Sequence, residues 1–290
     1  MLTKTAVIRW LAPFAVGAVA VAACGIGTSS LAPAAPSPTD APTQAPQAAG
    51  GPDYIVAAFG DSIAGEPGAV CPDCKPFVDR YGEAFAASTG QTVEVRNLGR
   101  PSLRVEQLLQ ELMDGSTAPG AAASADAILV AVGTSDAPWN ITDDACDGAA
   151  TAVDLVPWEM YTDACIAAEV ERFRPTFDAV FKRLVDLRGG LPTIYRAINR
   201  YNDWIGFEGE VPPEAIEVSV RYNDAWNPMI CETAEAHGFA CADIATAFNG
   251  ADGRTASGDL LAPDYIHPSD KGHELIANVL VDVGFAPFVP

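Results

Sequence analysis

The sequence is poor in basic residues and in histidine. Lys and Arg together number 17 against 38 Asp and Glu, which gives a formal net charge of −21. A surface this acidic repels nucleic-acid phosphates and anionic lipid headgroups, so nucleic acid is not an expected partner. The chain has only 3 histidines, and any imidazole chemistry must therefore use His237, His267 or His273.

Long hydrophobic runs are absent beyond the N-terminal region. No later segment approaches the roughly 18 apolar residues that a membrane-spanning helix needs, which excludes a polytopic membrane protein. The chain is nevertheless 49% apolar. That fraction suffices for a large buried core and excludes a disordered polymer.

The first 23 residues have the pattern of an export signal. Lys4 and Arg9 precede an apolar run, residues 10–23, that is too short to span a membrane comfortably. The run ends in Val-Ala-Ala-Cys at residues 21–24, which resembles the bacterial lipobox, so we expect lipidation of Cys24 after cleavage. The alternative is an ordinary signal peptide cut near the same place. Either way the protein is predicted to be extracytoplasmic, and the lipid anchor is its only expected membrane contact.

Residues 24–52 are dominated by Ala, Pro, Ser, Thr, Gln and Gly. Such a composition cannot bury enough apolar surface to offset its ordering entropy, and its prolines favour extended backbone. We therefore predict a tether over residues 24–52 and one folded domain over residues 53–290.

Six cysteines follow Cys24, an even number that favours three disulfides in an exported chain. The CPDC sequence at residues 71–74 could instead be a redox or zinc motif, but zinc would need a second ligand pair at compatible spacing. Six cysteines formally allow 15 connectivities. Pairing nearest neighbours along the chain gives Cys71–Cys74, Cys146–Cys165 and Cys231–Cys241.

Short apolar runs alternate with helical patterns from about residue 53 onward. The runs typical of buried strands cover residues 54–59, 93–98, 127–132, 191–198 and, more weakly, 240–244. Helical spacing occurs around residues 77–88, 103–113, 167–187, 215–237 and 268–283. Near-continuous apolar strands separated by amphipathic helices predict a parallel sheet covered on both faces, with ligands at the carboxyl ends of its strands.

Two long segments fit neither pattern and follow strands at that edge. Residues 137–166 contain Trp139 and Trp158, and residues 201–213 contain Trp204. Their aromatic side chains either wall a pocket or pack on the domain as ordinary loops.

A serine and a histidine at strand ends suggest nucleophilic chemistry. Ser62 follows the first strand in Gly60-Asp61-Ser62, and a serine nucleophile needs a base to take its proton. His267 is the best candidate, because Asp264 three residues earlier can accept its Nδ1–H and leave Nε2 free as a base. Either motif alone is weak, since Gly-Asp-Ser is a common turn and Asp-x-x-His often begins a helix.

The other two histidines have ordinary structural explanations. His237 precedes Gly238 where a helix is expected to stop, which suits a helix C-terminus. His273 falls inside the last predicted helix, where packing or a surface position is the default.

Four sequence blocks together resemble the SGNH/GDSL hydrolase family. In chain order they are Gly60-Asp61-Ser62, Asn97-Leu98-Gly99, Gly133-Thr134-Ser135-Asp136 and Asp264-x-x-His267. The resemblance implies a flavodoxin-like three-layer α/β/α sandwich with five parallel strands. It also implies Ser62 as nucleophile, His267 as base and Asp264 as its orienting partner, with the Ser62 and Gly99 N–H groups in the oxyanion hole.

The third block departs from the family pattern, which usually reads Gly-x-Asn-Asp. Ser135 stands where the family has an asparagine that donates to the oxyanion. Loss of one such donor costs about 10²–10³ in rate. Three outcomes are open: Ser135 donates directly or through water, Asn140 takes the role, or activity is weak.

The resemblance predicts a serine esterase that forms an acyl-enzyme and needs neither metal nor cofactor. We expect a monomer that acts on a small ester or on an acylated carbohydrate or lipid. The alternative is a lipid-anchored binding or envelope protein with a degenerate hydrolase site.

Overall fold

The computed structural model describes residues 51–65, 68, 70–115, 117–138, 146, 156–206 and 211–289. The expected signal, the lipidation site Cys24, almost all of the tether, Trp139 and Asn140 lie outside these residues. Among the described residues, no helix combines the length and apolar character that crossing a membrane requires.

Five parallel strands form one sheet, as the sequence predicts, in the order β2-β1-β3-β4-β5. The strands are β1 (Tyr54–Gly60), β2 (Val93–Asn97), β3 (Ala127–Ala131), β4 (Ile194–Ile198) and β5 (Ala240–Ala242). The chain crosses from β1 to β2 on one side and later to β3 on the other. The carboxyl ends of β1 and β3 therefore meet at the topological switch point, where ligands bind in such sheets.

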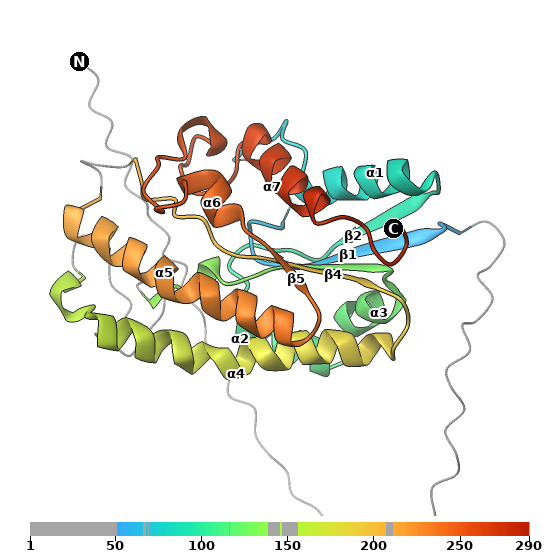
Figure 1. Cartoon of the computed structure of the whole chain (residues 1–290), viewed down its shortest axis with the longest axis horizontal. Coiled ribbons are helices and arrows are strands. Elements are labelled where there is room, and N and C mark those ends of the chain that lie inside the picture. The colour runs from blue at the N-terminus through green and yellow to red at the C-terminus, as the bar shows by residue number, and fades with distance from the viewer. Residues whose placement is uncertain are drawn as a thin grey trace, which may run out of the picture. The chain divides into compact units, whose positions relative to one another are not determined.

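Helices cover both faces of the sheet and complete the predicted three-layer sandwich (Figure 1). One layer contains α1 (Phe77–Thr89), α6 (Ile244–Asn249) and α7 (Asp270–Asp282). The other contains α2 (Val105–Met113), α3 (Thr117–Ser124), α4 (Asp163–Arg188) and α5 (Pro213–Ala236). Short 3₁₀ turns lie at Thr134–Asp136, Trp158–Met160 and Gly258–Leu260.

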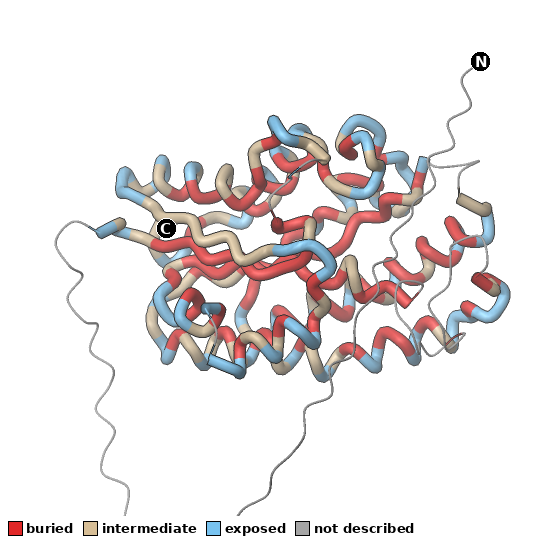
Figure 2. The backbone as a smooth tube through the Cα atoms, turned by 180° about the vertical axis from the view of Figure 1, so that it is seen from behind, coloured by how far each residue is buried: buried red, intermediate tan, exposed pale blue. Residues whose placement is uncertain are grey.

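Alternate residues of each strand supply the two halves of the core. In β1, Ile55, Ala57 and Phe59 pack toward the α2–α5 layer, whereas Val56 and Ala58 pack toward α1 and α7. This alternation follows from the two-residue period of a strand. Because both faces are covered, β1 and β3 at the centre of the sheet read as continuous apolar runs and are almost fully buried (Figure 2), whereas the edge strand β2 contains charged residues and is half-buried.

Several elements differ from the expectation: β4 begins three residues later, α4 begins four residues earlier, and α3 and α6 were not predicted. The fifth strand stops at Ala242, because Asp243 caps α6 by accepting the Thr246 N–H at 3.0 Å. The helix α3 was not predicted, since its sequence TAPGAAAS has no contrast between apolar and polar faces.

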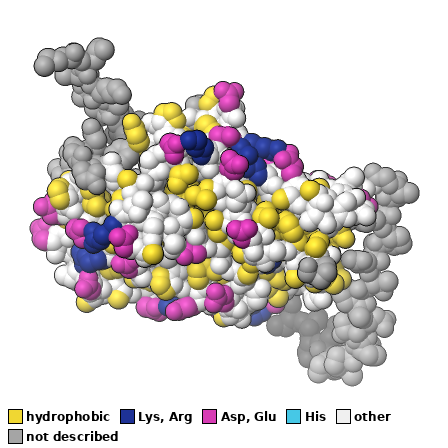
Figure 3. Space-filling model, turned by 45° about the horizontal axis from the view of Figure 1, so that its top comes forward, with side chains coloured by type: hydrophobic (Ala, Val, Ile, Leu, Met, Phe, Trp, Pro, Cys, Tyr) yellow, Lys and Arg dark blue, Asp and Glu magenta, His cyan; other side chains and the backbone are white. Residues whose placement is uncertain are grey.

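All six described cysteines are disulfide-bonded, in pairs that are neighbours along the chain: Cys71–Cys74, Cys146–Cys165 and Cys231–Cys241. The last pair ties α5 to β5. The charged surface shows no single patch on the face drawn in Figure 3: acidic groups are scattered, and several neighbour the few basic ones.

Candidate active site

The loop after β1 begins where two strands come unusually close. A Cβ atom on Gly60 would lie 2.1 Å from the carbonyl oxygen of Ala131 in β3, so only glycine fits there. The chain then turns sharply, with the Gly65 N–H bonded to the Asp61 carbonyl at 3.0 Å. Ser62 lies in this turn, partly exposed at the carboxyl edge of the sheet beside the switch point.

The carboxylate of Asp61 joins this turn to the loop after β3. It accepts the N–H of Ile63 at 3.0 Å and that of Thr134, 73 residues further along the chain, at 2.9 Å. The backbones of Gly133 and Ser135 also donate to it. Burial raises the pKa of Asp61, although these hydrogen bonds oppose the rise. Asp61 thus holds together two of the four sequence blocks, a role that the sequence did not reveal.

Asp136 extends the same contact from the loop after β3 to the start of α2. Both of its oxygens accept the Val105 N–H at 3.2 Å, at the first turn of α2, where unpaired N–H groups and the helix dipole favour a carboxylate. Burial raises the pKa of Asp136 to about 7, and the neighbouring carboxyl of Asp61 adds to the rise. The loops after β1 and β3 and the start of α2 are therefore connected through two buried acids.

The Asp264-x-x-His267 segment forms a tight turn in which the two end residues meet. Asp264 Oδ2 lies 2.5 Å from His267 Nδ1, and Oδ1 accepts the N–H groups of Ile266 at 3.2 Å and His267 at 3.1 Å. The hydrogen bond that His267 donates to Asp264 raises the pKa of His267 above its usual value, against the opposing effect of burial. Burial would raise the pKa of Asp264, but its hydrogen bonds with His267 and Ile266 bring it below the usual value.

Two further carboxylates act on His267 through space. Asp61 and Asp203 both contribute to the raised pKa of the imidazole. Asp61 directly precedes Ser62, so His267 lies within electrostatic reach of the turn that carries this serine. The structure thus brings Asp264 and His267 into direct contact and places them at the same edge of the sheet as Ser62.

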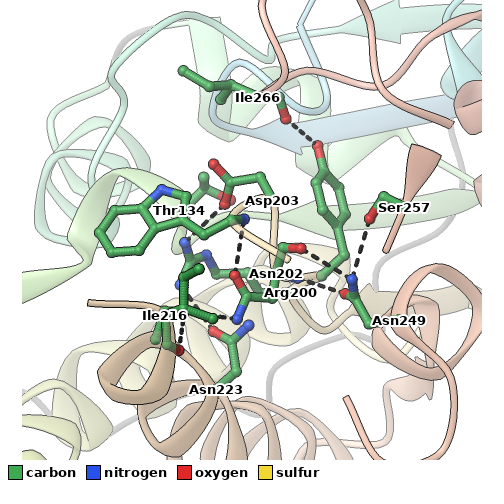
Figure 4. A network of polar contacts seen from close by, with 12 residues as sticks. Thr134, Arg200, Asn202, Asp203, Ile216, Asn223, Asn249, Ser257 and Ile266 are labelled. Atoms are coloured by element: carbon green, nitrogen blue, oxygen red, sulfur yellow. Dashed lines mark hydrogen bonds and ion pairs between the residues drawn. The ribbon is translucent and has the colours of Figure 1, made fainter. Parts of the chain in front are cut away.

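The loop after β4 contacts the turn formed by residues 264–267, at Ile266 (Figure 4). The Tyr201 hydroxyl donates to the carbonyl of Ile266 at 2.7 Å, next to His267. Its ring stacks on Phe248 with centroids 4.3 Å apart. The backbone of Asn202 and the side chain of Asn249 bond to each other in both directions, at 2.7 and 3.0 Å. The Tyr201 bond fixes the turn across 65 residues of sequence, and no pattern in the sequence indicated it.

A buried ion pair lies in the same loop. Arg200 contacts Asp203 at 3.4 Å and donates to Asn223 of α5 at 2.8 Å, as Figure 4 shows. Burial raises the pKa of Asp203, and the charge of Arg200 opposes this shift. The nearby aromatic segments also meet: Trp158 and Trp204 pack edge to face at 5.8 Å, which joins the two long segments singled out in the sequence.

Two candidate oxyanion groups have defined positions. The Gly99 N–H donates to Asn97 Oδ1 at 2.9 Å, while Asn97 Nδ2 donates to the Ala64 carbonyl at 2.7 Å. This N–H is thus bonded within its own loop, because the Asn97 side chain folds back onto it. Ser135 is partly buried in the 3₁₀ turn after β3, and its backbone donates to Asp61.

The remaining histidines have the structural positions expected of them. His237 is the residue at which α5 ends, and its Nε2 lies 2.8 Å from Asp178. His273 is buried in α7, where its Nδ1 accepts the Phe77 N–H at 3.4 Å. Burial lowers the pKa of His273 to about 4.

A cavity of about 440 Å³ lies away from Ser62, between α5 and α6. Several asparagines line it, but the amides of Asn199, Asn202, Asn227 and Asn249 already form hydrogen bonds with other parts of the chain. No trio of His, Cys, Asp or Glu in the described part of the chain is placed to hold a metal ion. The polar groups gathered at the sheet edge that carries Ser62 are a hydroxyl, an imidazole and carboxylates.

A model of the GDSL-like lipase/acylhydrolase family matches residues 58–275. That match covers most of the sequence, and the chain belongs to this family. No curated protein matches it in sequence.

Solved structures resemble the fold at low sequence identity. The lipase Lip_vut3 from a goat rumen metagenome is 17% identical, with 81% of this chain and 99% of that chain covered and a TM-score of 0.62. A mutant of the acetyl-xylooligosaccharide esterase Axe2 from Geobacillus is also 17% identical, with 82% and 97% covered and a TM-score of 0.52. These similarities support the α/β fold with its five parallel strands.

Proposed function

We propose that this protein is a serine esterase that hydrolyses carboxylic esters through an acyl-enzyme. The hydrogen-bonded pair of Asp264 and His267, at the sheet edge that carries Ser62, is the observation that supports this most directly. Membership of the GDSL-like lipase/acylhydrolase family supports the class of reaction.

In the proposed reaction, Ser62 Oγ attacks the ester carbonyl carbon as His267 Nε2 takes the hydroxyl proton. Asp264 holds Nδ1–H, which fixes the tautomer and stabilises the imidazolium that forms. The tetrahedral intermediate collapses, the C–O bond to the alcohol breaks, and His267 returns its proton to the leaving oxygen. Water then repeats the sequence on the acyl-enzyme, with His267 as base, and releases the carboxylic acid and free Ser62.

The developing oxyanion needs donors that are fixed before the reaction. We assign the Ser62 backbone N–H and the Ser135 hydroxyl to this role. The loops that carry them are held together by Asp61, which accepts hydrogen bonds from the backbone on both sides. Gly99 is left out because its N–H already bonds Asn97.

The proposed substrate is a small ester or an acylated carbohydrate or lipid outside the cytoplasm. The export pattern of residues 1–23 and the lipobox-like end at Cys24 support a lipid-anchored protein on the tether of residues 24–52. Cys24→Ala would then release the protein from the membrane into the soluble fraction. A Cys24→Ala protein that stays with the membrane would contradict the anchor.

Hydrolysis of a short-chain chromogenic ester tests the proposed activity. Ser62→Ala and His267→Ala should each reduce turnover to the buffer background. His237→Ala is the matched control, because His237 also contacts an aspartate but lies at the far end of α5. Turnover at the wild-type rate in Ser62→Ala would rule out the serine mechanism, whereas a folded wild-type protein without turnover would favour the alternative of a non-catalytic binding or envelope protein.

A further inference from the structure

The turn between Asp264 and His267 exposes two adjacent apolar side chains. Tyr265 is 53% exposed and Ile266 is 38% exposed. Single exposed apolar residues are common on protein surfaces and need no explanation. This pair is different because it lies inside the turn that holds the proposed base, where the Tyr201 hydroxyl fixes the Ile266 carbonyl.

The backbone of Tyr265 has an unfavourable conformation for its residue type. Its φ is +62°, in the left-handed region that residues with a Cβ atom rarely adopt. The turn requires this conformation, since Asp264 Oδ1 accepts the N–H groups of both Ile266 and His267. Glycine or asparagine would meet the requirement at a lower conformational cost.

The proposed reaction indicates which part of a substrate lies beside this turn. His267 returns its proton to the oxygen of the departing alcohol, so the alcohol part of the ester must lie beside the imidazole. Tyr265 and Ile266 belong to the same four-residue turn, whose backbone is held by Asp264 and Tyr201. The acyl part, attached to Ser62, departs only with water.

We infer that Tyr265 and Ile266 form a contact surface for the alcohol part of the ester, and that this alcohol is bulky and has an apolar face. The inference rests on the proposed esterase function and narrows its substrate class. An apolar contact of this size changes kcat/KM by about 10-fold or more between esters whose alcohol covers the surface and esters whose alcohol does not.

Two acetate esters that differ only in the alcohol test the inference. Benzyl acetate presents a bulky apolar alcohol and methyl acetate a small one, and both give the same acetyl-enzyme. Tyr265→Asn should lower the ratio of kcat/KM for benzyl acetate over methyl acetate by about tenfold. The melting temperature should be maintained or raised, because asparagine tolerates the left-handed conformation. Met113→Ala, which removes an exposed apolar side chain at the end of α2, should leave the ratio at the wild-type value.

The other outcomes are distinct. An unchanged ratio in Tyr265→Asn would overturn the inference, and so would an equal loss on both esters with a lower melting temperature, since that would indicate a structural role. Tyr265→Phe should keep the ratio, because it keeps the ring; if it loses the ratio as Tyr265→Asn does, the hydroxyl and not an apolar face makes the contact. Turnover that survives in Ser62→Ala would instead contradict the esterase proposal itself.

Discussion

Asp264 Oδ2 lies 2.5 Å from His267 Nδ1, and Oδ1 of the same carboxylate bonds the His267 backbone N–H at 3.1 Å. One side chain thus fixes both the ring and the backbone of the histidine. The pKa of His267 is raised mainly by the hydrogen bond between its ring and Asp264, and the carboxylates of Asp61 and Asp203 add to the shift. A base in this position is oriented before any substrate arrives.

The pH dependence of activity should report the Asp264–His267 contact. His267 must be neutral to accept the Ser62 proton, so a raised pKa places the acid limb of the kcat/KM profile above the 6.5 of an unperturbed histidine. Asp264→Asn removes the main cause of the shift, so the limb should move to lower pH. The maximal rate should fall by about 10²–10⁴, because the ring loses its fixed tautomer. A limb at the wild-type pH in Asp264→Asn would contradict the assignment of His267 as base.

The oxyanion assignment predicts a defined loss for Ser135→Ala. Removal of one donor costs about 10²–10³ in kcat, with KM nearly unchanged, when the donor acts only on the transition state. The Ser135→Asn protein gives the comparison, because a longer carboxamide that raises kcat would show that the native hydroxyl reaches the oxyanion poorly. An unchanged kcat in Ser135→Ala would remove Ser135 from the site.

The contact between Tyr201 and the Ile266 carbonyl should matter for rate as well as for stability. Tyr201→Phe keeps the ring stacked on Phe248 and removes only the hydroxyl. We expect a loss of about 1 kcal/mol in the free energy of unfolding and a fall in kcat of about tenfold with little change in KM. Tyr195→Phe, which removes a hydroxyl bonded to Thr193 near the start of β4, should leave kcat unchanged. Equal kcat for both variants would show that the Tyr201 hydroxyl does not position His267.

The buried acid Asp136 should make stability depend on pH. Its pKa is about 7 in the folded protein against 3.8 for an unperturbed carboxyl, so between these values the folded state holds a proton that the unfolded chain has lost. The free energy of unfolding should therefore fall as pH rises from about 4 to about 7, by an amount on the order of 4 kcal/mol. Asp136→Asn removes this titration, so urea unfolding at several pH values should show a smaller fall. Parallel curves for the two proteins would contradict the raised pKa.

The local pattern of apolar and polar residues along the chain was enough to predict most of the fold. The strands β1 to β5 begin and end within three residues of the predicted apolar runs, because strands covered on both faces need mainly apolar sequence. The alanine-rich helix α3 was missed. Its residues favour a helix but are not divided into an apolar and a polar face, so the sequence shows no helical periodicity there. The end of β5 was placed late because Ile244, which looks like strand sequence, begins a helix capped by Asp243.

The candidate site was predictable only where its residues are close in sequence. Asp264 and His267 are three residues apart, so their contact could be proposed from spacing. The bond from the Thr134 N–H to Asp61 and the bond from Tyr201 to Ile266 join residues 73 and 65 positions apart. Such contacts depend on which strand ends meet in space, and a single sequence does not contain that information.

Covalent labelling with a fluorophosphonate probe, followed by peptide mapping, tests the central claim most directly. The probe bonds its phosphorus to an activated serine oxygen and releases fluoride, and a protein that only binds esters should not react. The account predicts one labelled serine, Ser62, with labelling abolished in Ser62→Ala and strongly reduced in His267→Ala. A folded wild-type protein that remains unlabelled at Ser62, or that is labelled equally well after loss of His267, would contradict it.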